Sequence, residues 1–166
     1  MNRLDVTEAY KWWDVLRDEN QLTEIRLISN DGKTASGIFD NVDEIIKAIA
    51  PFTNDWNAYY TINRLPDDVR GLPQFNKIIV RPKQTCNDAT ITVRDYVCID
   101  LDSRRLSGTN ATDEQITYTK QTANEMYKYL KGVGFNSPVV VFSGNGVHLY
   151  LKCAMLNNDK NTKTVK

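Results

Sequence analysis

The sequence predicts a mixed α/β (α+β) fold built as two subdomains, residues 1–91 and 92–166. Segments with an apolar residue at every second position alternate with segments that repeat at helical spacing, so strands and helices are interleaved. From residue 92 onward the expected order is strand, helix, strand, strand. At 166 residues, the chain is long enough to bury a substantial core.

The first half begins with an expected helix over residues 6–18. Asp5 and Glu8 have the spacing of a capping box, and Trp12 and Trp13 fall on the apolar side, where we interpret them as core residues. Periodicity and turn residues predict the rest of this half. It comprises a strand (24–29), a turn (30–33), a strand (34–39), a helix (41–50), a strand (57–63), a loop (65–77), a short strand (78–81) and a loop (82–90).

The second half begins with a strand that alternates apolar and polar side chains and ends with Asp100 and Asp102 on its polar face. The helix begins with a capping box formed by Thr112 and Gln115. Glycines at the turn 144–146 join the last two strands. In order, this half comprises a strand (92–102), a loop (107–111), a helix (113–131), a strand (138–142) and a strand (147–153).

This order is that of a split β-α-β sheet of the ferredoxin or RNA-recognition-motif (RRM) type, spanning 92–153. A right-handed crossover through the helix is expected to make the strand 92–102 a neighbour of the strand 138–142, so that the carboxylates and His148 line one surface. Sheets of this type continue with another helix and a fourth strand. Residues 158–160 would start that helix, so we expect the final helix and strand to be missing.

Composition restricts the function classes. Lys and Arg number 21, as do Asp and Glu, so tight nonspecific binding to duplex nucleic acid is not expected, although a local basic groove is compatible with this balance. The chain lacks the GxxxxGK[ST] phosphate-binding loop that an ATPase of the P-loop type requires. Its single histidine excludes a nuclease that needs a pair of histidines. Three cysteines without a CxxC pair do not complete a usual zinc site and are expected to be reduced thiols.

The sequence also predicts a cytoplasmic protein without a membrane partner. No apolar stretch approaches the roughly 20 residues that span a bilayer, and no apolar signal region follows Met1.

Two motifs carry the candidate chemistry. Asp100 and Asp102 project from one face of a strand, where they repel each other unless a cation such as Mg²⁺ or Mn²⁺ lies between them. Their alternative interpretation is a pair of acids at a strand end that are solvated or form salt bridges with Arg104 or Arg105. The second motif runs from Ser143 to His148. Its glycines allow backbone N–H groups to approach a phosphate, and its alternative interpretation is an ordinary hairpin turn.

Together these motifs resemble motifs I and II of the archaeo-eukaryotic primase (primase-polymerase) superfamily, most closely its phage and plasmid branch. The resemblance covers residues 96–151, and 37–40 and 60–63 resemble that branch more weakly. It rests on Ile99-Asp100-Leu101-Asp102, Arg105, Gly108-Thr109-Asn110-Ala111-Thr112-Asp113-Glu114, Gly134-Phe135, Pro138 and Ser143-Gly144-Asn145-Gly146-Val147-His148-Leu149.

The resemblance implies a DNA primase/polymerase domain that transfers nucleotides from NTP or dNTP onto a single-stranded DNA template or primer-template, in phage, plasmid or mobile-element replication, with a helicase as a further partner. It makes Asp100 and Asp102 catalytic ligands of Mg²⁺ or Mn²⁺, with His148 as a third catalytic residue. The implied nucleotide-binding residues are Ser143, Gly144, Asn145, Gly146, His148 and Arg105. One departure is the third motif of the family, whose Asp has no counterpart on a strand after His148.

A non-enzymatic alternative is a nucleic-acid-binding or nucleotide-binding module, or a truncated regulator of replication. Exposed tyrosines would stack on bases. A groove would be supplied by Lys77, Arg81, Lys83, Arg94, Arg104 and Arg105.

Overall fold

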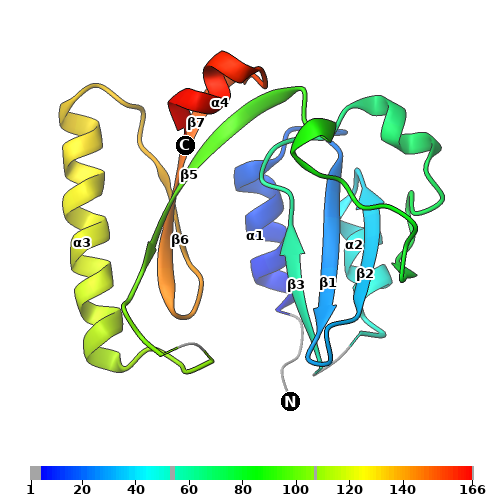
Figure 1. The fold of residues 1–166 in the computed structure, drawn as a ribbon, viewed down its shortest axis with the longest axis horizontal. Helices are drawn as coiled ribbons and strands as arrows, with labels where there is room; N and C mark the ends of the chain where they lie inside the picture. Colours follow the sequence, from blue (N-terminus) through cyan, green and yellow to red (C-terminus); the bar gives the residue numbers. More distant parts are fainter. Residues whose placement is uncertain (1–4, 53–54, 107, 166) are drawn as a thin grey trace. The chain divides into compact units, whose positions relative to one another are not determined.

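The computed structural model describes residues 5–52, 55–106 and 108–165, and it confirms the mixed α+β class (Figure 1). Ser107, the first residue of the loop expected at 107–111, lies outside the described residues. The chain divides into two compact units. Unit 1 comprises the chain up to Arg94 together with Met155–Lys163, and unit 2 comprises Asp95–Ala154 with the residues from Thr164 onward. Residues 155–163 therefore group with the N-terminal part.

Unit 1 is built on a four-stranded sheet with the order β3-β1-β2-β4. Local signals explain its elements: Asp5 accepts a hydrogen bond from the Glu8 N–H (3.1 Å), and the turn after β1 closes through Ser29 N–H and the Lys33 carbonyl (2.9 Å). The elements are α1 (Val6–Leu16), β1 (Thr23–Ser29), β2 (Thr34–Phe39), α2 (Val42–Ile49), β3 (Trp56–Tyr60), η1 (Asp67–Gly71), β4 (Ile79–Val80) and η2 (Asp88–Thr90), and α4 (Asp159–Val165) follows late in the chain.

The core of unit 1 lies between the sheet and helices α1 and α2. Ile25 and Leu27 of β1 are buried there, and Trp12 and Trp13 pack against this cluster, which confirms their interpretation as core residues. A second cluster, around Ile38 and Leu65, covers part of the opposite face. The expected strand 57–63 begins one residue earlier and ends at Tyr60, so β3 is shorter than predicted.

Unit 2 contains α3 (Asp113–Gly132), β6 (Val139–Phe142) and most of β5 (Val93–Asp102) and β7 (Gly146–Leu156). The first two residues of β5 and the last two of β7 belong to unit 1. The sheet order is β5-β7-β6, so the expectation that the strand bearing Asp100 lies beside the strand 138–142 is wrong. Its neighbour is β7. After the α3 crossover returns the chain to β6, the hairpin folds β7 back antiparallel to β6 and into the space next to β5.

Helix α3 covers one face of this sheet. Its N-terminus has the predicted capping box, in which Thr112 Oγ1 accepts from Gln115 N–H and Gln115 Oε1 accepts from Thr112 N–H. Ala123 and Leu130 of the helix pack on Val147, Leu149 and Leu151 of β7. Side chains that alternate with these therefore project from the opposite face of the sheet.

Candidate functional site

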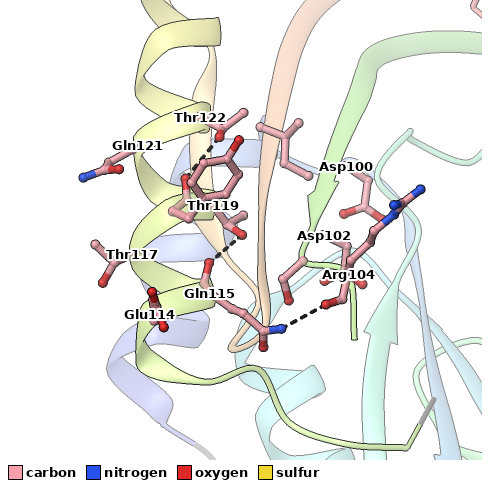
Figure 2. A pocket seen from close by; sticks show the side chains of 12 residues that line it. Asp100, Asp102, Arg104, Glu114, Gln115, Thr117, Thr119, Gln121 and Thr122 are labelled. Atoms are coloured by element: carbon pink, nitrogen blue, oxygen red, sulfur yellow. Dashed lines mark hydrogen bonds between the residues drawn. The ribbon is translucent and has the colours of Figure 1, made fainter. Parts of the chain in front are cut away.

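Strand β5 places the two carboxylates on the face of the unit 2 sheet opposite α3. Ile99 and Leu101 pack with the α3 core, so the alternating Asp100 and Asp102 point the other way (Figure 2). The Asp100 and Asp102 side chains are 66% and 52% exposed. Both are thus open to a ligand from solvent.

His148 lies on the neighbouring strand and contacts the first of these acids. Its Nε2 is 3.3 Å from Asp100 Oδ1, and its Nδ1 is 3.1 Å from the hydroxyl of Tyr150. Tyr150 is buried, so it fixes the imidazole from one side while Asp100 fixes it from the other. We call the surface bearing Asp100, Asp102, His148 and Tyr150 the polar face of unit 2.

Arg105 holds the second acid. Its guanidinium donates to Asp102 Oδ1 (2.7 Å), and its Nε donates to the Thr109 carbonyl (3.0 Å). Only 21% of the Arg105 side chain is exposed. The pairing expected under the alternative interpretation of the acids is therefore present. Arg105 also ties the strand end to the loop that precedes α3.

The turn between β6 and β7 packs against the end of β5. Gly146 N–H donates to Ser143 Oγ (3.1 Å), and Gly144 has φ of +97°, a conformation that favours glycine. A Cβ at Gly146 would lie 2.6 Å from the Leu101 carbonyl oxygen and 2.9 Å from Asp102 Oδ1. Gly146 is therefore the residue that lets the turn approach the acidic strand so closely.

Asn145 has a structural partner that the sequence did not reveal. Its Oδ1 accepts a hydrogen bond from the Ala111 N–H (2.9 Å), which joins the turn to the loop before α3. The segment 108–112 and the turn 143–146, which both contribute to the resemblance, are thus in direct contact. The hydroxyl of Ser143 is likewise used inside the turn, where it also lies 3.2 Å from the Gly146 carbonyl oxygen.

A hollow of about 980 Å³ adjoins the same end of β5 (Figure 2). Within the described part of the chain β5 is an edge strand, and the hollow is bounded by its last residues and the first half of α3. Gln115 Nε2 donates to the Arg104 carbonyl (2.9 Å) at its rim. The volume lies within the range of small-molecule sites, roughly 300–1,000 Å³. Its lining comprises Asp100, Leu101, Asp102, Ser103, Arg104, Glu114, Gln115, Thr117, Tyr118, Thr119, Gln121 and Thr122.

Cys98 shares the face of β5 that carries the acids. Burial, and secondarily the negative charge of Asp100, raise the pKa of the Cys98 thiol. The thiol therefore stays neutral near pH 7 and adds no further negative charge beside the carboxylates.

The candidate residues thus come together in part. The structure brings Asp100 to His148, Asp102 to Arg105 and Gly146 to Asp102. Among the described residues, no group of three or more His, Cys, Asp or Glu side chains is arranged to hold a metal ion. The carboxylates themselves fit Mg²⁺ or Mn²⁺ chemically, since both are exposed oxygen donors on one face. Tyr150 was not predicted as a partner of His148, although its position two residues along the strand placed it on the same face.

Comparison with known proteins adds no assignment: no protein-family model, characterised protein or solved structure matches the chain significantly. Of the helices in the described ranges, none combines the length and apolar character needed to cross a membrane.

Proposed function

We propose that unit 2 is the nucleotidyltransferase part of a primase-polymerase, acting on NTP or dNTP with a single-stranded DNA template or primer-template. The observation that supports this most directly is the 3.3 Å approach of His148 Nε2 to Asp100 Oδ1 on adjacent strands. A histidine donor beside an acid pair suits a metal-bound triphosphate, because it offers a hydrogen bond to the phosphates next to the metal's carboxylate ligands.

In this proposal Asp100 and Asp102 hold Mg²⁺ or Mn²⁺, which when bound neutralises charge that develops on the phosphate oxygens. To bind the phosphates, His148 Nε2 would exchange its contact with Asp100 Oδ1 for a phosphate oxygen, while the Tyr150 hydroxyl at Nδ1 keeps the ring oriented. Arg105 leaves one oxygen of Asp102 for the metal and limits the movement of that carboxylate. The turn 143–146 lies beside the acids through the buried Gly146, and its residues Ser143 and Gly144 are exposed. A replicative helicase is a further partner under the same proposal.

Nucleotide binding measured by calorimetry tests the proposal. The chain is titrated with ATP and with dATP in the presence of Mn²⁺, and again in EDTA. We expect binding that requires the metal and that Asp100→Asn and His148→Ala each weaken at least tenfold. Glu125→Gln is the matched control, since it removes an exposed carboxylate from α3 without touching the polar face. Metal-independent binding, or binding unchanged in Asp100→Asn, would contradict the proposal.

A second candidate is a module that binds nucleotide or nucleic acid without transferring it. It is supported by the ion pair between Arg105 and Asp102, which gives one of the two acids a structural role. The same titrations separate the candidates, because a module of this kind retains binding in EDTA and in Asp100→Asn.

A further inference from the structure

The second face of the unit 1 sheet is only partly covered. Beyond the cluster around Ile38 and Leu65, Arg26 of β1 lies directly opposite Tyr59 of β3, and Ile28 follows on the same face. Tyr59 is 53% exposed and Ile28 is 36% exposed. Directly opposed residues in an antiparallel pair have Cβ atoms about 5 Å apart, so the side chains of Tyr59 and Arg26 leave the sheet side by side.

A groove of about 680 Å³ continues from this patch. We call it the basic groove and define it by Arg26, Ile28, Lys33, Arg81 and Lys83. Four cations line it against a single carboxylate, that of Asp31, although the whole chain has zero formal net charge. A smaller hollow of about 300 Å³, lined by Tyr59 among others, shares Arg26 with it. Positive charge and an exposed ring therefore lie on one continuous surface.

The four cations differ in their availability. Lys33 pairs with Asp31 (2.5 Å), and Arg26 pairs with the buried Glu24 (2.6 Å). Arg81 and Lys83 are exposed, and neither has an ion-pair partner within the described ranges. These two side chains are thus the charges that an incoming anion would meet first.

The backbone at Arg81 is held in an uncommon conformation. Its φ is +54°, in the left-handed region that non-glycine residues rarely adopt, and Pro82 follows immediately. The N–H of Arg81 donates to the Thr34 carbonyl (2.8 Å), which anchors the residue to β2. Strained positions of this kind persist where surrounding structure enforces them and are concentrated at ligand-contacting sites.

We infer that unit 1 binds single-stranded nucleic acid on this surface. Arg81 and Lys83 neutralise backbone phosphates, while Tyr59 stacks on an unpaired base. Single strands are favoured over duplex because only unpaired bases offer a face to the tyrosine. DNA and RNA share this phosphate-and-base chemistry. The inference does not rest on nucleotide binding by unit 2, because all of its residues belong to unit 1.

Fluorescence anisotropy with the full chain tests the inference, using labelled dT20, rU20 and a 20-base-pair DNA duplex. We expect dT20 or rU20 to bind more tightly than the duplex, and the tighter of the two identifies the natural class. Arg81→Ala/Lys83→Ala should weaken binding about tenfold, and it should reduce the slope of log affinity against log salt by about 1.4, at 0.7 per lost phosphate contact. Tyr59→Ala should weaken binding about tenfold and Tyr59→Phe by less than twofold, because phenylalanine keeps the stacking ring.

The control is Lys11→Ala/Lys47→Ala, which removes the same charge from α1 and α2, on the helix-covered side of the sheet. It should bind like the wild type. An equal loss in the control, an unchanged affinity in Arg81→Ala/Lys83→Ala, or equal binding of duplex and single strands would overturn the inference. Circular dichroism melts establish that each variant is folded. Loss of nucleotide binding in Asp100→Asn with oligonucleotide binding intact would separate this surface from the site proposed in unit 2.

Discussion

Replacing Gly146 by alanine tests how closely β7 must approach β5. The added methyl group would lie 2.6 Å from the Leu101 carbonyl oxygen and 2.9 Å from Asp102 Oδ1. Ordinary contact begins at about 3.4 Å, so the backbone of one strand must move by close to 1 Å. Because the nearest atom belongs to backbone, no side-chain rotation relieves the clash. Overpacking of this kind typically costs about 1–3 kcal/mol.

We therefore expect Gly146→Ala to lower the free energy of unfolding by about 1–3 kcal/mol in urea titrations. It should also weaken Mn²⁺-dependent nucleotide binding, because the displacement falls on Asp102 itself. Gly132→Ala is the control, since nothing lies within 4 Å of its added Cβ and its φ is not positive. Gly144→Ala adds strain at φ +97° without a contact and so measures the conformational cost alone. Wild-type stability in Gly146→Ala would refute the close approach of the turn to β5.

Two further predictions concern Arg105 and Cys86. Arg105→Ala should lower the free energy of unfolding by no more than about 1 kcal/mol, because Asp102 is half exposed and solvent screens such ion pairs. The same substitution should alter the affinity for Mn²⁺ measured by calorimetry. A loss of several kcal/mol would contradict this prediction and would show that Arg105 is part of the core. Burial, with a smaller contribution from Glu24, raises the pKa of the Cys86 thiol from 9.0 to about 12. Between pH 9 and 12 the unfolded chain therefore loses the Cys86 proton more readily than the folded chain does. The free energy of unfolding is unaffected by this thiol below pH 9 and decreases as the pH rises from 9 toward 12. Urea unfolding from pH 8 to 10 should show a steeper decline in the wild type than in Cys86→Ala, and parallel declines would contradict the assignment.

Local signals in the sequence were sufficient for most elements of the fold. The Thr112–Gln115 capping box and the alternation along β5 depend on neighbours a few residues apart, so their pattern is complete in the sequence. The same alternation placed Asp100, Asp102 and His148 on faces free of the core. Ends of elements were less predictable, as at β3, where Thr61 leaves the strand although its N–H still donates to the Glu24 carbonyl (3.1 Å).

Contacts between distant segments could not be predicted in this way. The hydrogen bond from Ala111 N–H to Asn145 and the contact of Gly146 with Leu101 join positions 34 and 45 residues apart. A local pattern carries no information about which backbone atom a glycine must approach. The basic groove also could not be predicted from local patterns, because its cations come from three separate segments of the chain. These are β1, the turn after β1 and the segment after β4.

The order of the unit 2 strands decides whether the candidate site exists at all. Neighbouring strands lie about 4.8 Å apart, so with β6 beside β5, as the sequence had suggested, His148 would stand two strands and about 10 Å from Asp100. With β7 in the middle the separation is one strand, and the two side chains meet at 3.3 Å. Because residue 146 is glycine, the start of β7 can approach the end of β5 closely at Leu101 and Asp102. The contact between Asp100 of β5 and His148 of β7 therefore depends on the strand order and on the absence of a side chain at Gly146. Variants at Gly146 test both requirements together.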